Sequence, residues 1–204
     1  MIKKRIVLSM MVIALLASAF TVVHEDLHQA MNKMMQKMKS MKMTGDPDKD
    51  FAGLMIEHHQ GAIDAANIVV KSGKDKEIKL MAQKILSSQP QDQKDLHHLN
   101  AKHDQSHAAH AQGTSATHIS QFPNEIKGIM DAMDSRMKNI KMSGNLDYDF
   151  ATMILDHHEA AIALANAEIK YGTVTEVKSI AEKIKSDSQR DINELQRWKS
   201  QHDK

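Results

Sequence analysis

Apolar residues recur along the chain at spacings of three and four, a pattern typical of helices that bury one face. The clearest case is a methionine stripe in a helix expected over about residues 27–43. The stripe consists of Met31, Met34, Met38 and Met41. Two more helical patterns follow over about 46–71 and 76–103, and no stretch alternates as a half-buried strand would. Helices joined by such short turns pack as antiparallel neighbours, so the pattern predicts an all-α helical bundle.

Capping and turn residues set the expected limits of these helices. Gly45 ends the first helix, while Asp46 and Pro47 supply an N-cap residue and a first-turn proline for the middle one. Gly73 ends the middle helix. Pro90 is expected to kink the third helix, because proline removes one backbone hydrogen bond.

The chain carries this pattern twice. With Asp50 aligned to Asp149, an offset of 99 residues, the two halves match without a gap. Met31, Met34, Met38 and Met43 recur as Met130, Met133, Met137 and Met142. We therefore expect a tandem duplicated antiparallel bundle, with about three helices per repeat, over residues 24–103 and 123–204. A polar, histidine-rich linker is expected between them, over residues 104–122.

The first 19 residues have the make-up of a secretory signal peptide. Lys3, Lys4 and Arg5 precede an apolar run that ends in small residues, and we expect cleavage after Ala19. An uncleaved N-terminal anchor is the alternative. The mature chain is expected in the periplasm or outside the cell, with no membrane attachment. It keeps 24 basic and 26 acidic side chains, a balance that predicts no nucleic-acid partner, and it has no cysteine for a disulfide.

Two adjacent histidines, His58 and His59, interrupt the alanine-rich middle helix, and His157 and His158 copy them in the second half. An antiparallel hairpin centred just after Gly45 brings methionines of the preceding helix to the depth of each pair. These are Met31, Met34 and Met35 in the first half and Met130 and Met133 in the second. Sulfur and nitrogen donors are thus expected at the same depth in both repeats.

Two further features point to the same depth. Met55 shares a helix face with the first histidine pair, and Met153 does so with the second. The third helix of each half breaks its apolar seam with polar residues around Asp92 and Asp191. The bundle is therefore expected to contain a polar layer beside the histidines.

The chemistry of these donors favours a soft or borderline metal ion. Neutral imidazole and thioether sulfur suit copper, above all Cu(I), and its mimic Ag(I), whereas hard ions need converging carboxylates. Zinc more often uses thiolates, which are absent from this chain. A plainer interpretation is also open, with the methionines as core filler and the histidines hydrogen-bonded to Glu57 or Asp156. The repeated conjunction of histidine pair, methionines and polar break favours the metal.

The segment DFAGLMIEHHQGAIDAA and its copy DFATMILDHHEAAIALA resemble the hallmark of a secreted bacterial family, the domain of unknown function 305. The resemblance covers both repeats and nearly all of the mature chain. It implies a ferritin-like helical bundle, because members of the family have that fold. It also implies a role in copper sequestration or copper resistance in the bacterial envelope, since one member is a methionine-rich periplasmic copper-binding protein.

We therefore expect a periplasmic or secreted protein that binds copper, as Cu(I) or else as Ag(I) or Cu(II), and buffers it without enzymatic activity. The expected partners are the metal ion and envelope proteins that donate or accept copper. The expected metal ligands are Met31, Met34, Met38, Met55, His58, His59, Met130, Met133, Met137, Met153, His157 and His158.

Two other functions stay open at this point. A structural helical adaptor would use its methionine-rich faces to bind partner helices. A ferritin-like metal oxidase would need Glu-x-x-His pairs on several helices, whereas the sequence has only one such pair, Glu25 with His28.

Overall fold

The computed structural model describes residues 26–107 and 121–202, and these two ranges form six helices and no strand. The all-α prediction is therefore confirmed for the described part of the chain. The helices are a first helix over residues 26–40, α2 (Pro47–Ser72), α3 (Lys76–His107), α5 (Phe122–Asn139), α6 (Leu146–Tyr171) and α7 (Thr175–His202). No helix in the described ranges is long and apolar enough to cross a membrane.

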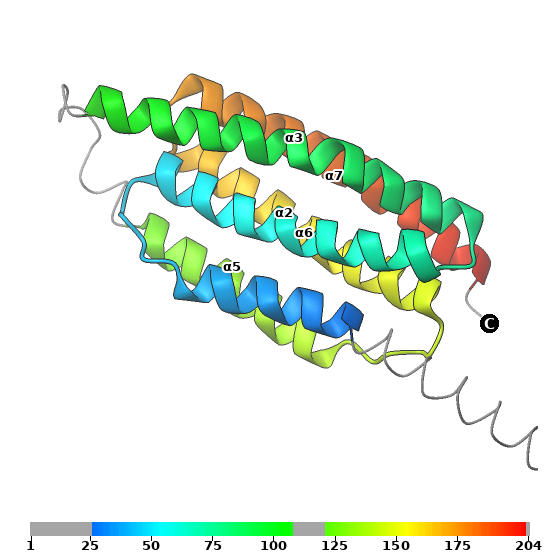
Figure 1. Cartoon of the computed structure of the whole chain (residues 1–204). Coiled ribbons are helices and arrows are strands. Elements are labelled where there is room, and N and C mark those ends of the chain that lie inside the picture. Colours follow the sequence, from blue (N-terminus) through cyan, green and yellow to red (C-terminus); the bar gives the residue numbers. More distant parts are fainter. Residues whose placement is uncertain (1–25, 108–120, 203–204) are drawn as a thin grey trace, which may run out of the picture.

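The six helices lie in three layers of two (Figure 1). The first helix and α5 form one outer layer, α2 and α6 the middle layer, and α3 and α7 the other outer layer. Helix α2 packs against α3 and α6, and α6 packs against α5 and α7. The middle helices are covered on two sides, which explains their alanine content, because small side chains let neighbouring helices approach closely. Ala62, Ala65, Ala66, Ala160, Ala161 and Ala165 are all buried.

The predicted helix caps are confirmed. The Asp46 side chain accepts hydrogen bonds from the backbone N–H groups of Asp48 and Lys49, and Pro47 occupies the first turn of α2. Asn145 caps α6 in the same way. Helix α3 continues through Pro90 to His107, a few residues beyond its predicted end.

The first helix ends at residue 40 instead of 43, and this changes the depth of its methionines. Residues 41–46 form a non-helical connection to α2. The carboxylate of Asp50, in the first turn of α2, accepts hydrogen bonds from the N–H groups of Thr44 and Gly45. Gly45 has φ +83°, a conformation that favours glycine. An extended residue covers about twice the length of a helical one, so the hairpin is not symmetric about Gly45.

The packing between the first helix and α2 is consequently shifted by about one helical turn from the predicted register. Met34 packs against Gly61, and Lys37 binds Glu57 at 2.8 Å. The expectation that Met31 lies level with the histidine pair is therefore wrong. Residues between Met34 and Met38 lie at that depth instead.

The two halves share one core and cap each other's loops. The Asp48 carboxylate accepts hydrogen bonds from the N–H groups of Thr173 and Val174, between α6 and α7. In the other direction, Asp147 accepts from the N–H groups of Lys74 and Asp75, between α2 and α3. The predicted signal peptide over 1–19 and most of the predicted linker over 104–122 lie outside the described residues.

Candidate metal centre

The four predicted histidines meet in one buried layer at the contact between α2 and α6. His58 and His157 are completely buried, and His59 and His158 are at most 3 % exposed. The rings of His58 and His157 stack with centroids 3.7 Å apart and an interplanar angle of 27°. The Nε2–H group of His157 donates a hydrogen bond to the backbone carbonyl of His58 at 2.9 Å. The two repeats therefore contribute to a single histidine layer.

Most of the imidazole nitrogens in this layer have no hydrogen-bond partner. They are Nδ1 and Nε2 of His58, His59 and His158, together with Nδ1 of His157. A buried polar atom without a partner costs about 1–3 kcal/mol, so such atoms call for a reason beyond packing. A ligand that accepts nitrogen lone pairs would provide that reason.

Burial keeps three of these imidazoles neutral, those of His58, His157 and His158. Burial, followed by the neighbouring imidazoles His157, His59 and His158, holds the pKa of His58 well below its ordinary value. Burial likewise lowers the pKa of His157 well below that value. For His158, burial and then the nearby His59 and Lys84 lower the pKa to about 3. A neutral imidazole keeps one nitrogen lone pair available to a metal ion.

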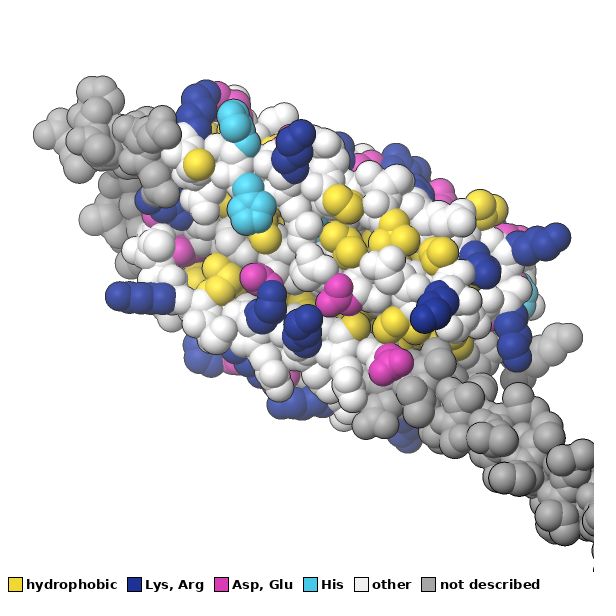
Figure 2. Space-filling model, in the orientation of Figure 1, with side chains coloured by type: hydrophobic (Ala, Val, Ile, Leu, Met, Phe, Trp, Pro, Cys, Tyr) yellow, Lys and Arg dark blue, Asp and Glu magenta, His cyan; other side chains and the backbone are white. Residues whose placement is uncertain are grey.

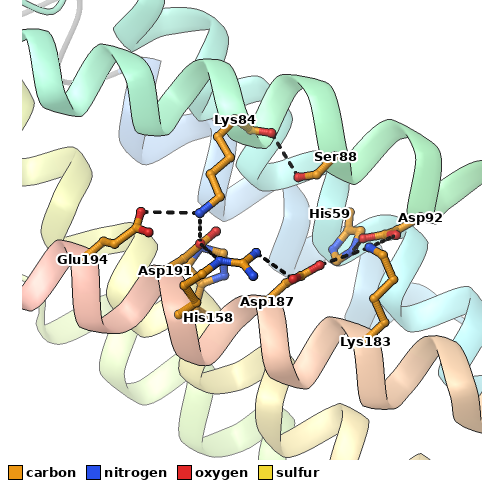
Figure 3. A network of polar contacts seen from close by, with 10 residues as sticks. His59, Lys84, Ser88, Asp92, His158, Lys183, Asp187, Asp191 and Glu194 are labelled. Atoms are coloured by element: carbon orange, nitrogen blue, oxygen red, sulfur yellow. Dashed lines mark hydrogen bonds and ion pairs between the residues drawn. The ribbon is translucent and has the colours of Figure 1, made fainter.

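The two outer histidines face carboxylates from α3 and α7 (Figure 3). His59 Nε2 lies 3.7 Å from Asp92 Oδ2, and His158 Nε2 lies 3.8 Å from Asp191 Oδ2. These distances are longer than a hydrogen bond. The predicted polar break in the third helix of each half is therefore confirmed, although Asp92 and Asp191 were not among the predicted ligands.

Each of these carboxylates is bound by a lysine from the opposite half. Lys183 Nζ lies 2.9 Å from Asp92 Oδ1, and Lys84 Nζ lies 2.5 Å from Asp191 Oδ1. Burial alone would raise the pKa of Asp92, but His59 and Lys183 outweigh it and hold the pKa below its ordinary value. The sequence analysis missed both lysines. Lys84 and Lys183 are 99 positions apart, the same offset that relates the two histidine pairs. That repeated spacing could have identified the lysines as equivalent residues of the two halves.

The plainer interpretation of the histidines does not match the structure. Glu57 binds Lys37 at 2.8 Å, and Asp156 forms an ion pair with Arg136. Neither carboxylate holds an imidazole by a hydrogen bond in the described structure. The histidines are therefore not explained as buried residues satisfied by these two acids.

The predicted sulfur donors all lie inside the bundle. Met34 packs on Gly61, one turn beyond His58. The eight predicted methionine ligands, each at most 7 % exposed, are Met31, Met34, Met38, Met55, Met130, Met133, Met137 and Met153. Met35 is buried as well. Thioether sulfur and imidazole nitrogen thus share one apolar interior.

The layer is a set of buried donors rather than a finished cage. In the described part of the chain, no group of three or more His, Cys, Asp or Glu side chains is already arranged to hold a metal ion. A small cavity of about 10 Å³ lies beside His158, between Met81 and Asp191. That volume is close to the room that a single water needs. Metal binding in this layer would require the imidazoles to turn.

The described part of the chain exposes few large hydrophobic side chains to which a partner helix could bind. In the view of Figure 2, charged side chains are interspersed among the hydrophobic ones. Leu80, on α3, is the one large hydrophobic side chain that is exposed among the described residues. The methionine stripes are turned inward, whereas an adaptor would present them to solvent.

Comparison with known proteins gives two matches. The model of a family described as "Domain of unknown function (DUF305)" matches residues 15–99 and 48–199. The crystal structure of a DUF305 fragment from Deinococcus radiodurans is similar, with a TM-score of 0.52 and 17 % sequence identity. The similarity covers 74 % of this chain and 93 % of that one and, at this identity, bears on the fold alone. No curated protein matches the chain.

Proposed function

The chain belongs to the DUF305 family, whose function is unknown, and we propose that this member binds a soft metal ion, Cu(I) above all, in its buried histidine layer. The role would be to sequester or buffer copper in the periplasm or outside the cell, in support of copper resistance or homeostasis. Ag(I) would be taken up as a mimic, and Cu(II) would bind less well. Envelope proteins that donate or accept copper would be the partners.

The observation that carries this proposal is the set of buried imidazole nitrogens without a partner. Four imidazoles from α2 and α6 lie together in an interior that also holds eight methionines from four helices. Imidazole and thioether are the donor types that copper prefers among the side chains of a protein without cysteine. Coordination would also remove the cost of leaving these nitrogens unpaired.

The donors would divide between two types of ligand. His58, His59, His157 and His158 would supply the nitrogen atoms, and Met34, Met38, Met133 and Met137, buried on the first helix and α5, would supply sulfur. Met55 and Met153 would add sulfur from the middle helices themselves.

The test is an anaerobic titration of the mature protein with Cu(I) against a competing chelator, beside parallel titrations with Ag(I) and Zn(II). We expect tight Cu(I) binding that is lost when all four histidines are changed to glutamine, a neutral residue of similar size. The matched control is His97→Gln with His98→Gln, which changes two exposed histidines on α3. Equal copper affinity and stoichiometry in the four-histidine variant and the control would refute the proposal.

A second measurement covers the outcome that the four-histidine variant does not fold. Bound metal stabilises the native state by mass action, so Cu(I) should raise the melting temperature of the unaltered protein by an amount that grows with the logarithm of its affinity. In the variant His59→Gln with His158→Gln, Cu(I) should raise the melting temperature by a smaller amount. A melting temperature that does not respond to Cu(I) would count equally against the site.

A further inference from the structure

The ion pairs beside the histidine layer are exchanged between the two halves of the molecule. Lys84, on α3 of the first half, reaches Asp191 on α7 of the second, and Lys183 on α7 reaches Asp92 on α3 (Figure 3). The side chains of Asp92 and Asp191 are only 8 % and 16 % exposed. Each carboxylate therefore lies between an imidazole of its own half and an ammonium group of the other half.

The remaining charges around the layer are also largely compensated. Lys183 contacts Asp187 at 3.1 Å, and Asp187 is bound by Arg190 at 2.6 Å. Arg190 Nε also lies 3.9 Å from Asp191 Oδ1, and Glu194 Oε2 lies 3.4 Å from Lys84 Nζ at the partly exposed edge of the layer. The two carboxylates that face the outer histidines are thus each paired with an ammonium group, Asp92 with Lys183 and Asp191 with Lys84.

This balance bears on the charge of the ion that the layer can accept. Carboxylates that are already paired with ammonium groups compensate little of the charge of an entering ion, and the desolvation cost of an ion grows as the square of its charge. A monovalent cation therefore loses far less than a divalent one. Free carboxylates would reverse this preference, because they offset the second charge and are ligands that harder ions prefer.

We propose that Lys84 and Lys183 are selectivity residues, which bind Asp191 and Asp92 respectively and so make the histidine layer favour monovalent soft cations over divalent ones. This inference rests on the proposed function, because it assigns the charge preference of the same site. The alternative role for the two lysines is simply to hold the halves together. That role would affect stability without changing which metal ion binds better.

The experiment compares Zn(II) and Cu(I) affinities, each measured by chelator competition, in the unaltered protein and in Lys84→Gln with Lys183→Gln. We expect the ratio of Zn(II) to Cu(I) affinity to rise by at least about tenfold in this variant, equivalent to ~1.4 kcal/mol. Co(II) serves as a spectroscopic probe, and we expect its ligand-field absorption bands to appear in the variant but not in the unaltered protein. Circular dichroism and thermal melting show whether the variant is folded.

Three further variants separate charge from stability. Arginine at both positions keeps the positive charges and should keep the original ratio. Adding Asp92→Asn and Asp191→Asn to the glutamine variant removes the negative charges too and should restore the preference for Cu(I). The control is Lys37→Gln with Lys170→Gln, which removes two cross-helix ion pairs, to Glu57 and Glu125, from the outer surface of the bundle.

The outcomes distinguish this inference from the proposed function. If the unaltered protein does not bind Cu(I), the proposed function fails and the selectivity inference fails with it. If it binds Cu(I) and the folded glutamine variant keeps the same metal ratio, only the selectivity inference is overturned. Should the glutamine variant not fold, the variant Asp92→Asn with Asp191→Asn decides. Its lysines have no carboxylate partner, so it should lose more Zn(II) affinity than Cu(I) affinity. Equal losses of the two affinities would overturn the inference.

Discussion

The imidazoles of His58 and His157, equivalent residues 99 positions apart, stack with centroids 3.7 Å apart where α2 meets α6. The duplicated motif therefore builds one layer across the two halves instead of two separate sites. His59 and His158 flank the stacked pair and face Asp92 and Asp191. A ligand held by both His58 and His157 would contact both halves, so its binding would be coupled to the association of the halves.

Changing Met34 and Met133 to leucine should weaken Cu(I) binding with little effect on folding. Leucine fills a similar volume, so the free energy of unfolding of the apoprotein should fall by less than ~1.5 kcal/mol. Loss of two thioethers should reduce Cu(I) affinity about tenfold or more, equivalent to ~1.4 kcal/mol. The matched control changes Met43 and Met142 to leucine; these residues lie in the loops after the first helix and α5. Equal copper affinities in the two variants would remove the methionines from the site.

Two glycine-to-alanine substitutions should have opposite effects on stability. A Cβ atom at Gly61 would lie 2.5 Å from Met34 Sδ and 2.8 Å from Met34 Cβ, so the first helix must shift. Gly61→Ala should therefore destabilise the protein by about 1–3 kcal/mol. Gly128, on α5, has no atom within 4 Å of that position, and Gly128→Ala should stabilise by ~0.5–1 kcal/mol. Urea unfolding of both variants checks this, and a stable Gly61→Ala would contradict the packing of Met34.

Removal of the carboxylates that cap the opposite half should destabilise the bundle. Asp147→Ala leaves the N–H groups of Lys74 and Asp75 without their acceptor, and Asp48→Ala does the same between α6 and α7. Each change should lower the free energy of unfolding by about 1–3 kcal/mol. Asp131→Ala removes an exposed ion pair with Lys127 and should cost less than ~1 kcal/mol. Comparable losses from Asp147→Ala and Asp131→Ala in chemical unfolding would argue against the caps.

Glu168 should make the stability of the apoprotein fall at alkaline pH. Burial, followed by the charge of nearby Asp48, raises the pKa of Glu168 to about 9 from an ordinary value of 4.5. Because the folded-state pKa lies above the unfolded value, this contribution to stability is fully present below pH 4.5 and is lost as the pH rises towards 9.

Glu168→Gln keeps the size of the side chain and cannot ionise. At pH 9 the variant should be more stable than the unaltered protein by about 1–3 kcal/mol, a difference that shrinks towards pH 5. Urea unfolding of the apoprotein at pH 5, 7 and 9 measures this, with Glu182→Gln, at an exposed position on α7, as the control. Parallel pH profiles for the unaltered protein and Glu168→Gln would exclude a buried neutral carboxyl group.

Local signals in the sequence predicted the helices well. Asp46, Asn145 and Gly73 mark their limits through hydrogen bonds between neighbouring residues, and such bonds depend on a few consecutive positions. The burial of the methionine stripes also follows from spacing alone, because a helix with one apolar face must cover that face. The offset of 99 residues predicted two equivalent halves.

Relationships between helices were harder to predict. The register of the first helix depends on how far residues 41–46 extend, and six loop residues carry no periodic pattern that fixes this length. The stacking of His58 on His157 and the exchange of Lys84 and Lys183 depend on how one half faces the other. Helical periodicity assigns a residue to a face but does not identify the helix that covers it.

The most direct test of the copper site is X-ray absorption at the copper edge, on mature protein loaded anaerobically with one equivalent of Cu(I). We predict a spectrum of Cu(I) bound by imidazole nitrogen and thioether sulfur, and loss of the imidazole contribution in the four-histidine glutamine variant. A spectrum with light-atom ligands from water or carboxylate and no sulfur, unchanged in that variant, would contradict copper binding in the histidine layer.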